Sequence, residues 1–161
     1  MKLVVSDKCL GLIENLAEFY PEARWQRCVV PFYRNVWTAV PHGRVREVTA
    51  MLKAIHAQED KKAAREKALQ VVQKLKELRL QKAAEMVQNG IDETLSYYDF
   101  PEERHRMIRT NNPMERIIRE IRRRTRVVGS FPDGNSALML AAARLRYVAG
   151  TAWGERRYLD M

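Results

Sequence analysis

An apolar run at residues 3–5, Leu-Val-Val, constrains the fold of this chain more than any other feature of its sequence. A short, continuous run of apolar residues rich in valine is typical of a strand that is buried on both faces. We expect this strand to end at Ser6-Asp7. A second strand is predicted at 24–30, where polar and apolar residues alternate before two valines. Because a buried strand normally needs neighbours on both sides, we expect the N-terminal part of a larger domain to be absent from this chain.

Helical periodicity dominates the rest of the sequence. Apolar residues recur every three or four positions, and proline or glycine marks most of the breaks. The helices expected from this pattern are 10–20, 32–40, 45–55, a long helix or helical pair at 60–88, 91–98, 101–107, one that begins at Asn112, and 137–149 with Asn135 or Ser136 as its cap. The predicted fold is therefore two early strands followed by a chain that is nearly all helix.

The composition is that of a basic, folded protein. With 161 residues and 46% hydrophobic residues, the chain is long and apolar enough for one core. A pI near 9.8 favours nucleic acid as the partner, with an anionic membrane surface as the weaker alternative. Two cysteines, no apolar run of membrane-spanning length and no signal-peptide pattern predict a cytoplasmic protein in a reducing compartment.

Positive charge is concentrated between residues 104 and 126. That segment contains nine arginines and two acids, a net charge of +7 in a chain whose total is +9. A cationic surface of this density attracts polyanions. Guanidinium groups also match the geometry of phosphate oxygens, so we expect the segment to bind nucleic acid.

Asp7 and Glu115 are the two acids whose positions suggest chemistry, and each also has a structural explanation. Asp7 follows a strand, where α/β folds place ligand-binding residues, but it also fits a cap of the next helix or turn. Glu115 lies in the first turn of the arginine-rich helix. With Asn112 as N-cap it has capping-box spacing, and an ion pair with Arg119 is a further local role. Spacing alone leaves both explanations open for each acid.

A helical wheel of the segment that begins at Asn112 adds weight to a functional role for Glu115. Met114, Ile117, Ile118 and Ile121 share one arc, the expected buried face, and Glu115, Arg119, Arg122 and Arg126 share the opposite arc. A carboxylate inside a phosphate-binding stripe weakens simple DNA binding. It makes sense if a divalent metal ion bridges the acid and a phosphate.

Cysteine and histidine form no metal-binding pattern in the sequence. Position 31, three residues after Cys28, is a proline, so we expect Cys28 to be a buried residue of the second strand. The histidines at 42, 56 and 105 lack zinc-ligand spacing to one another.

Four motifs, in order along the chain, resemble those of bacterial mutator-type insertion-sequence transposases. They are Val-Val-Ser-Asp-Lys-Cys-Leu-Gly-Leu at 4–12, Trp-Gln-Arg-Cys at 25–28, Phe-Tyr-Arg-Asn-Val at 32–36, and Thr-Asn-Asn-Pro-Met-Glu-Arg at 110–116 with Ile-Arg-Arg-Arg-Thr-Arg-Val-Val-Gly at 121–129. The likeness runs from about Leu3 to Tyr158, which is essentially the whole chain.

The resemblance implies a ribonuclease H-like catalytic domain with an Asp-Asp-Glu triad, which cuts and joins DNA at element ends with two Mg²⁺ ions. Asp7 matches the second Asp and Glu115 matches the Glu, and the family uses both as metal ligands. The first Asp belongs before residue 1. The chain is therefore expected to be the C-terminal portion of a transposase and to be inactive in strand cleavage by itself.

The resemblance also implies a division into three regions. Residues 1–40 would be the C-terminal part of the ribonuclease H-like core, 41–108 a helical insertion, and 109–161 returning core helices. The residues expected to bind DNA are Arg109, Asn111, Asn112, Arg116, Arg119, Arg122, Arg123, Arg124 and Arg126. The expected partners are insertion-sequence ends and target DNA, together with a second copy of the chain or a full-length transposase.

The sequence departs from the family pattern at Pro31. The family usually carries Cys-x-x-His after the second Asp, and Pro31 stands where that His would be. Two other functions therefore stay open. One is a DNA-binding remnant that binds element ends or inhibits full-length transposase, and the other is a relic that keeps only a partial core.

Overall fold

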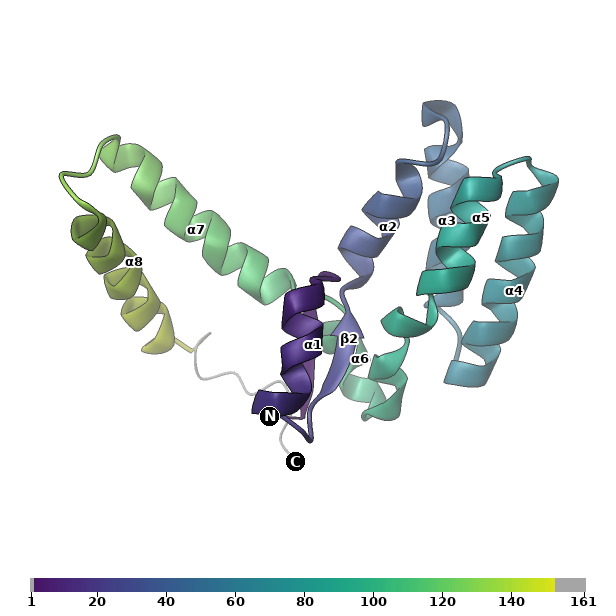
Figure 1. Ribbon diagram of the computed structural model, residues 1–161, viewed down its shortest axis with the longest axis horizontal. Helices are drawn as coiled ribbons and strands as arrows, with labels where there is room; N and C mark the ends of the chain where they lie inside the picture. Colours follow the sequence, from purple (N-terminus) through teal and green to yellow (C-terminus); the bar gives the residue numbers. More distant parts are fainter. Residues whose placement is uncertain (1, 153–161) are drawn as a thin grey trace. The chain divides into compact units, whose positions relative to one another are not determined.

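The computed structural model describes residues 2–152 (Figure 1). The chain divides into two compact units, residues 1–110 and 111–161. The first contains β1 (Leu3–Ser6), α1 (Leu10–Phe19), β2 (Arg24–Arg27), α2 (Val29–Trp37), α3 (Val45–Ile55), α4 (Lys61–Glu77), α5 (Gln81–Gly90), α6 (Glu102–Ile108) and the 3₁₀ turns η1 (His42–Arg44), η2 (Asp92–Thr94) and η3 (Ser96–Asp99). The second contains α7 (Asn112–Val128) and α8 (Gly134–Ala149). The prediction of two early strands followed by helices is confirmed, and none of the described helices has the length and apolar character to cross a membrane.

The two strands pair in parallel and are connected by α1. Leu3 lies opposite Arg24 and Ser6 lies opposite Arg27. β1 is half-buried along its whole length, not fully buried as expected. Within the described residues the sheet has two strands, so β1 has one neighbouring strand to cover it.

The second strand is shorter than predicted. β2 ends at Arg27, and the two valines at 29–30 begin α2 instead of extending the strand. Pro31 stands in the first turn of α2, where a proline is tolerated because its missing N–H would have no partner within the helix. Cys28 is fully buried, as expected, but it is the N-cap of α2 and not a strand residue.

Helices α2 to α5 pack beside one another and enclose the core of the first unit (Figure 1). Its fully buried aliphatic side chains include Val36, Val48, Leu52, Ile55, Leu75, Val87 and Leu95. The segment at 60–88, predicted as one long helix or a helical pair, is a helical pair. α4 ends at Glu77 and α5 begins at Gln81. Asp60 caps α4, since its carboxylate accepts a hydrogen bond of 2.7 Å from the Ala63 N–H.

A buried glutamine, Gln26, connects β2 to the turns that follow α5. Its amide nitrogen donates to the Thr94 carbonyl at 2.7 Å, and its amide oxygen accepts from the Tyr97 N–H at 2.9 Å. The turns themselves are closed by backbone hydrogen bonds between residues three positions apart, as in a 3₁₀ helix. The Thr94 N–H, for example, donates to the Ile91 carbonyl at 2.9 Å. The helix predicted at 91–98 is therefore two 3₁₀ turns, because Gln26 occupies a backbone N–H that a continuous helix would need.

A buried histidine, His56, lies within an aromatic cluster of the first unit. Its ring centroid is 5.7 Å from that of Tyr33 and 6.0 Å from that of Tyr97. Its two ring nitrogens lie 3.3 Å from the Tyr97 hydroxyl and 3.4 Å from the Thr94 hydroxyl. Burial, and then the positive charge of Arg109, lower the pKa of His56 to about 3. His56 is therefore neutral at pH 7 and belongs to the core.

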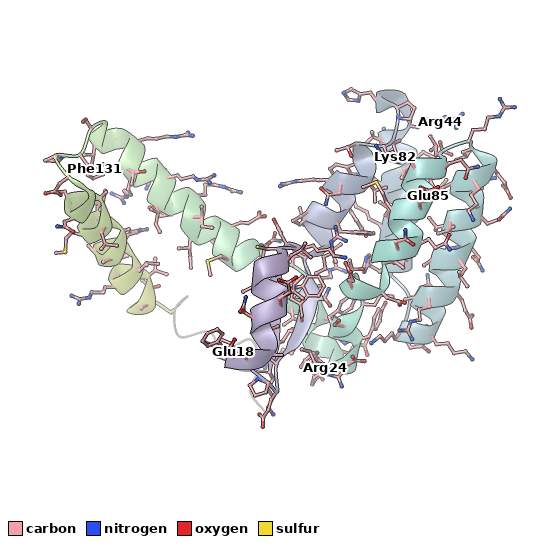
Figure 2. The ribbon with its side chains drawn as sticks, viewed as in Figure 1. Glu18, Arg24, Arg44, Lys82, Glu85 and Phe131 are labelled. Atoms are coloured by element: carbon pink, nitrogen blue, oxygen red, sulfur yellow. The ribbon has the colours of Figure 1, made fainter. Side chains whose placement is uncertain are left out.

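The second unit is a hairpin of α7 and α8. Gly129 ends α7 with a φ of 76°, a left-handed conformation that glycine adopts without strain. Phe131 lies in the connection between the two helices (Figure 2). Asp133 caps α8, because its carboxylate accepts a hydrogen bond of 2.6 Å from the Ser136 N–H. The prediction of Asn135 or Ser136 as the cap is wrong, because the helix begins earlier, at Gly134. Ser136 instead donates its N–H to the capping residue three positions before it.

Candidate functional site

Asp7 lies at the carboxyl end of the parallel strand pair, directly after β1. Its carbonyl oxygen accepts hydrogen bonds from the Cys9 N–H at 2.8 Å and from the Ser6 hydroxyl at 2.9 Å. The Ser6 oxygen in turn accepts from the Trp25 indole N–H at 2.9 Å. Cys9 is the N-cap of α1, so capping of that helix does not explain Asp7. The side chain is exposed, and within residues 2–152 its carboxylate has no hydrogen-bond or ion-pair partner.

Backbone hydrogen bonds fix the strand ends to the helices around them. The Cys28 N–H donates to the Ser6 carbonyl at 2.8 Å, and the Val29 N–H donates to the Arg109 carbonyl at 3.2 Å. Arg109, which follows α6, is half-buried. One residue expected to bind DNA is therefore held at the same end of the strand pair as Asp7.

The +7 segment of the sequence does not form one surface of one unit. Its first three arginines, at 104, 106 and 109, lie on α6 or directly after it in the first unit. The other six lie on α7 in the second unit, and all six are exposed: Arg116, Arg119, Arg122, Arg123, Arg124 and Arg126. The prediction treated the segment as continuous because charge counted along a sequence does not see the break at residue 110.

Glu115 is less readily explained by capping than its sequence position indicates. α7 begins at Asn112 with Asn111 as the N-cap, so Glu115 is the fourth helical residue and not the third. The capping-box explanation requires the third position. No ion pair joins Glu115 to Arg119 in the described part of the chain. Its half-exposed carboxylate is therefore open to another role.

The apolar arc of α7 is only partly covered. Met114 is 56% exposed and Ile118 is 41% exposed, while Ile117 and Ile121 are half-buried. The expectation that this arc is a buried face is wrong for the second unit by itself. One partner helix, α8, covers only part of an arc of this width.

Glu120, which neither the motifs nor the capping pattern singles out, is the most heavily paired acid among the described residues of the hairpin. Its carboxylate accepts from Arg123 at 2.9 Å, from Arg124 at 3.3 Å and from Arg144 of α8 at 2.9 Å. Hydrogen bonds from Arg123 in particular lower the pKa of Glu120 to about 2. Spacing along α7 indicates the first two pairs. The third joins two helices and requires the hairpin to be known.

A cavity of about 410 Å³ lies between α7 and α8 beside Glu120. It is lined by the arginines at 116, 119, 123 and 144, and by Tyr147, whose ring lies 4.7 Å below the Arg144 guanidinium. Guanidinium groups are bidentate donors to phosphate. Arg144, held over the Tyr147 ring, thus extends the cationic surface to α8.

The two candidate acids belong to different units, Asp7 to the first and Glu115 to the second. Among residues 2–152 no three His, Cys, Asp or Glu side chains gather into a group that holds a metal ion. The donor chemistry of the two acids nevertheless fits Mg²⁺, which prefers carboxylate oxygens, and both side chains are accessible.

Comparison with known proteins matches residues 1–151 to the family described as Transposase, Mutator family. The chain is 33% identical over 162 residues to the transposase for insertion sequence element ISRM5 of Rhizobium meliloti (strain 1021), covering 100% of this chain and 40% of that protein. It is 35% identical over 159 residues to the transposase for IS1081 of Mycobacterium tuberculosis (strain ATCC 25618 / H37Rv), covering 99% and 38%. It is 28% identical over 145 residues to the transposase for IS256 in transposon Tn4001 of Staphylococcus aureus, covering 89% and 37%. The chain spans about two fifths of the length of these relatives.

Proposed function

The chain belongs to the Mutator family of transposases, and we propose that it forms part of a transposase that moves an insertion sequence by cutting and joining DNA. The observation that carries this proposal is the row of six exposed arginines on α7. Arginines along one helix bind the regularly spaced phosphates of a DNA backbone, largely without regard to base sequence. We assign this contact to Asn111, Asn112, Arg116, Arg119, Arg122, Arg123, Arg124 and Arg126 of the second unit, and a separate DNA contact to Arg109 of the first unit.

Asp7 and Glu115 are the two acids of this proposal. Asp7 follows a parallel strand at the end where α/β folds bind ligands, which is consistent with a partial ribonuclease H-like core. Two Mg²⁺ ions, when bound, supply activation of the attacking oxygen and stabilisation of the leaving oxygen. The role of Asp7 and Glu115 is to hold these ions, and the role of the arginines is to fix the scissile strand. Such a protein acts wherever the DNA is, which in a bacterium is the cytoplasm.

A second function is a DNA-binding protein without cleavage activity. It is favoured by the absence of a three-ligand group in the described residues. In this form the chain binds insertion-sequence ends, or associates with another copy or with full-length transposase and inhibits it. Both functions require the same arginine surface.

The test of the arginine surface is a salt titration of DNA affinity, measured by fluorescence anisotropy with a labelled duplex. Arg122→Gln/Arg126→Gln removes two charges from α7. The matched control, Arg46→Gln/Lys62→Gln, removes two charges from exposed positions on α3 and α4. We expect the α7 variant to bind roughly tenfold more weakly and its salt slope to fall by about 1.8, at about 0.9 for each lost phosphate contact. Equal losses in the two variants would contradict the proposal.

A nicking assay with Mg²⁺ or Mn²⁺ distinguishes the two functions for these 161 residues. We expect binding without strand cleavage. The family triad has three acids, and Asp7 and Glu115 match only two of them. Metal-dependent cleavage that disappears in Asp7→Ala would show that the chain is a complete nuclease, and the DNA-binding function would then be rejected.

A further inference from the structure

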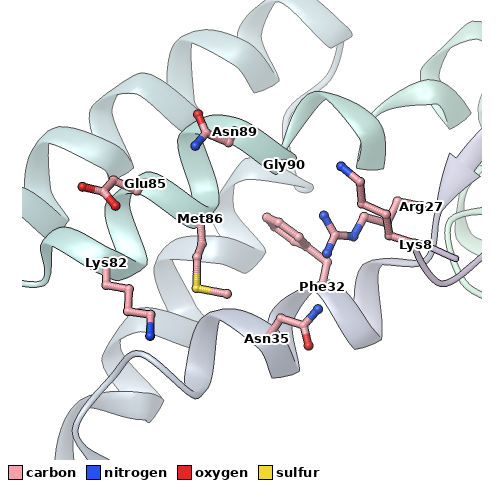
Figure 3. Close-up of a pocket in the computed structure, with 9 residues that line it drawn as sticks. All are labelled: Lys8, Arg27, Phe32, Asn35, Lys82, Glu85, Met86, Asn89 and Gly90. Atoms are coloured by element: carbon pink, nitrogen blue, oxygen red, sulfur yellow. The ribbon is translucent and has the colours of Figure 1, made fainter. Parts of the chain in front are cut away.

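An open cleft of about 360 Å³ lies between α2 and α5 in the first unit (Figure 3). Lys82 stands at one end, and Lys8 and Arg27 stand at the other. The uncharged side chains of Phe32 and Met86 lie between the two ends. The cleft therefore has cationic side chains at both ends and uncharged side chains between them.

The end formed by Lys8 and Arg27 keeps a positive charge. Both cations bind the same acid, Glu93, with the Lys8 ammonium at 2.5 Å and the Arg27 guanidinium at 3.0 Å. Two cations share one carboxylate, so one charge remains uncompensated by this acid. Arg27 also lies over the Phe32 ring, 5.0 Å from its centroid, a cation–π contact that fixes its orientation.

Gly90 holds this end of the cleft in shape. A Cβ at position 90 would lie 2.9 Å from the Arg27 guanidinium and 2.9 Å from the edge of the Phe32 ring. Phe32 is only 1% exposed, so its ring has no room to withdraw. The close approach of α5 thus depends on glycine, and it keeps Arg27 at the edge of the cleft.

Lys82 at the other end is an exposed lysine of α5 (Figure 2). Within residues 2–152 it has neither an ion pair nor a hydrogen bond. Glu85 also lines the cleft, so the three cations of the lining face two acids, Glu85 and the Glu93 that Lys8 and Arg27 share, and one positive charge is left over. Two amides, those of Asn35 and Asn89, are exposed along the same cleft and are able to donate hydrogen bonds.

We propose that this cleft binds one strand of DNA, with a phosphate at Lys82 and another at Lys8. A nucleic-acid strand repeats a charged phosphate after each uncharged sugar and base, which matches a cleft with cations at both ends. Lys8 directly follows Asp7 in the chain, so this end of the cleft is next to that acid in sequence. The inference rests on the proposed function, since it assigns the cleft to the same DNA. It adds a contact in the first unit that the count of charge along residues 104–126 does not indicate, and it includes Lys82, which lies outside the four motifs.

The test compares Lys82→Gln with Lys62→Gln by the same anisotropy titration, using labelled single-stranded and duplex DNA. Lys62 is an exposed lysine of α4 that has no ion pair in the described residues, so both variants lose one surface charge. We expect Lys82→Gln to bind roughly three- to tenfold more weakly, with a salt slope lower by about 0.7 on single-stranded DNA and about 0.9 on duplex DNA. Lys62→Gln should bind like the parent chain. Lys8→Gln should resemble Lys82→Gln, and Lys82→Arg should retain affinity.

The outcomes separate this inference from the proposed function. If the α7 double variant loses affinity but Lys82→Gln and Lys62→Gln behave alike, the cleft is rejected and the arginine surface stands. If the parent chain binds no DNA at all, both are rejected. If Lys82→Gln alone loses affinity and Lys82→Arg restores it, the cleft is a DNA contact.

Discussion

The two units of this chain separate stability from charge. In residues 1–110, α2 to α5 surround a core of fully buried aliphatic side chains. Among the described residues of the second unit, no side chain of α7 or α8 is buried. The second unit instead carries ten arginines against five acids in 51 residues, a net +5, while the first carries +4 over 110 residues.

This difference shows that the units are held together by different interactions. The first unit depends on burial of apolar surface and on buried hydrogen bonds, which are insensitive to salt. The hairpin depends on helix caps, on partial packing and on the arginine pairs of Glu120, which weaken as salt rises. A protein that must bind a polyanion gains from such a division, because the binding surface is then free of the constraints of a core.

The largest expected contrast is between apolar truncations in the two units. Leu75→Ala, in a side chain that is 0% exposed, should lower the free energy of unfolding by about 2–5 kcal/mol. Leu138→Ala on α8, at 67% exposed, should change it by less than about 0.5 kcal/mol. Urea denaturation followed by circular dichroism measures both. Similar losses at the two positions would contradict the division.

Removal of polar contacts should show the same contrast at a smaller scale. Gln26→Leu keeps the volume but leaves the buried Thr94 carbonyl and Tyr97 N–H without their partner, so we expect a loss of about 2–3 kcal/mol. Glu120→Gln should leave the same unfolding transition in place and weaken only the contact between α7 and α8. The control Gln73→Leu, at an exposed position of α4, should be nearly neutral.

As the pH falls, the first unit should lose stability before the ion pairs of Glu120 in the hairpin are broken by protonation. His56 has a pKa of about 3 when folded against 6.5 for the ordinary group, so between these values the unfolded chain binds a proton that the folded chain excludes. The contribution of neutral His56 to the free energy of unfolding is complete above pH 6.5. It is lost as the pH falls, by about 2 kcal/mol between pH 7 and 5. Glu120, whose pKa is about 2, keeps its charge over this range. Urea titrations at the two pH values check the loss, which should shrink in His56→Gln.

Helix caps should give the smallest contrast. Asp60 caps α4 in the first unit and Asp133 caps α8 in the second, each through its carboxylate. Asp60→Ala should lower the free energy of global unfolding by about 1 kcal/mol. Asp133→Ala should reduce helical content without moving that transition. A shift of the global transition by Asp133→Ala would show that the hairpin and the first unit unfold together.

The positions of most helices follow from the sequence because apolar periodicity and breaking residues are local signals. The helix at 45–55, for example, is found with the predicted bounds. The same local signals misplace the end of β2, since Val29 and Val30 favour a strand by propensity while the chain needs a helix start at Cys28. The cap of α8 is misplaced by two or three residues for a related reason, as three polar candidates stand in one turn.

The candidate site is predictable only where it depends on motifs or on spacing. The motifs around Asp7 and Glu115 identify the family, and the helical wheel correctly exposes the arginines of α7. Contacts between distant segments escape this reasoning. Arg144 reaches Glu120 from another helix, and Lys8 and Lys82 line one cleft although they are 74 positions apart in the chain. The break between the units at residue 110 also leaves no compositional trace.

Binding of Mn²⁺ to the DNA-bound chain, followed by electron paramagnetic resonance, tests most directly whether Asp7 and Glu115 serve one metal site. The measurement is a double-mutant cycle of the parent, Asp7→Asn, Glu115→Gln and the double variant. Glu18→Gln is the charge control, because Glu18 is an exposed acid of α1. If the two acids share a site, each single substitution removes the specific binding and the double variant loses no more. Additive partial losses, or a loss no larger than that of Glu18→Gln, would contradict the account.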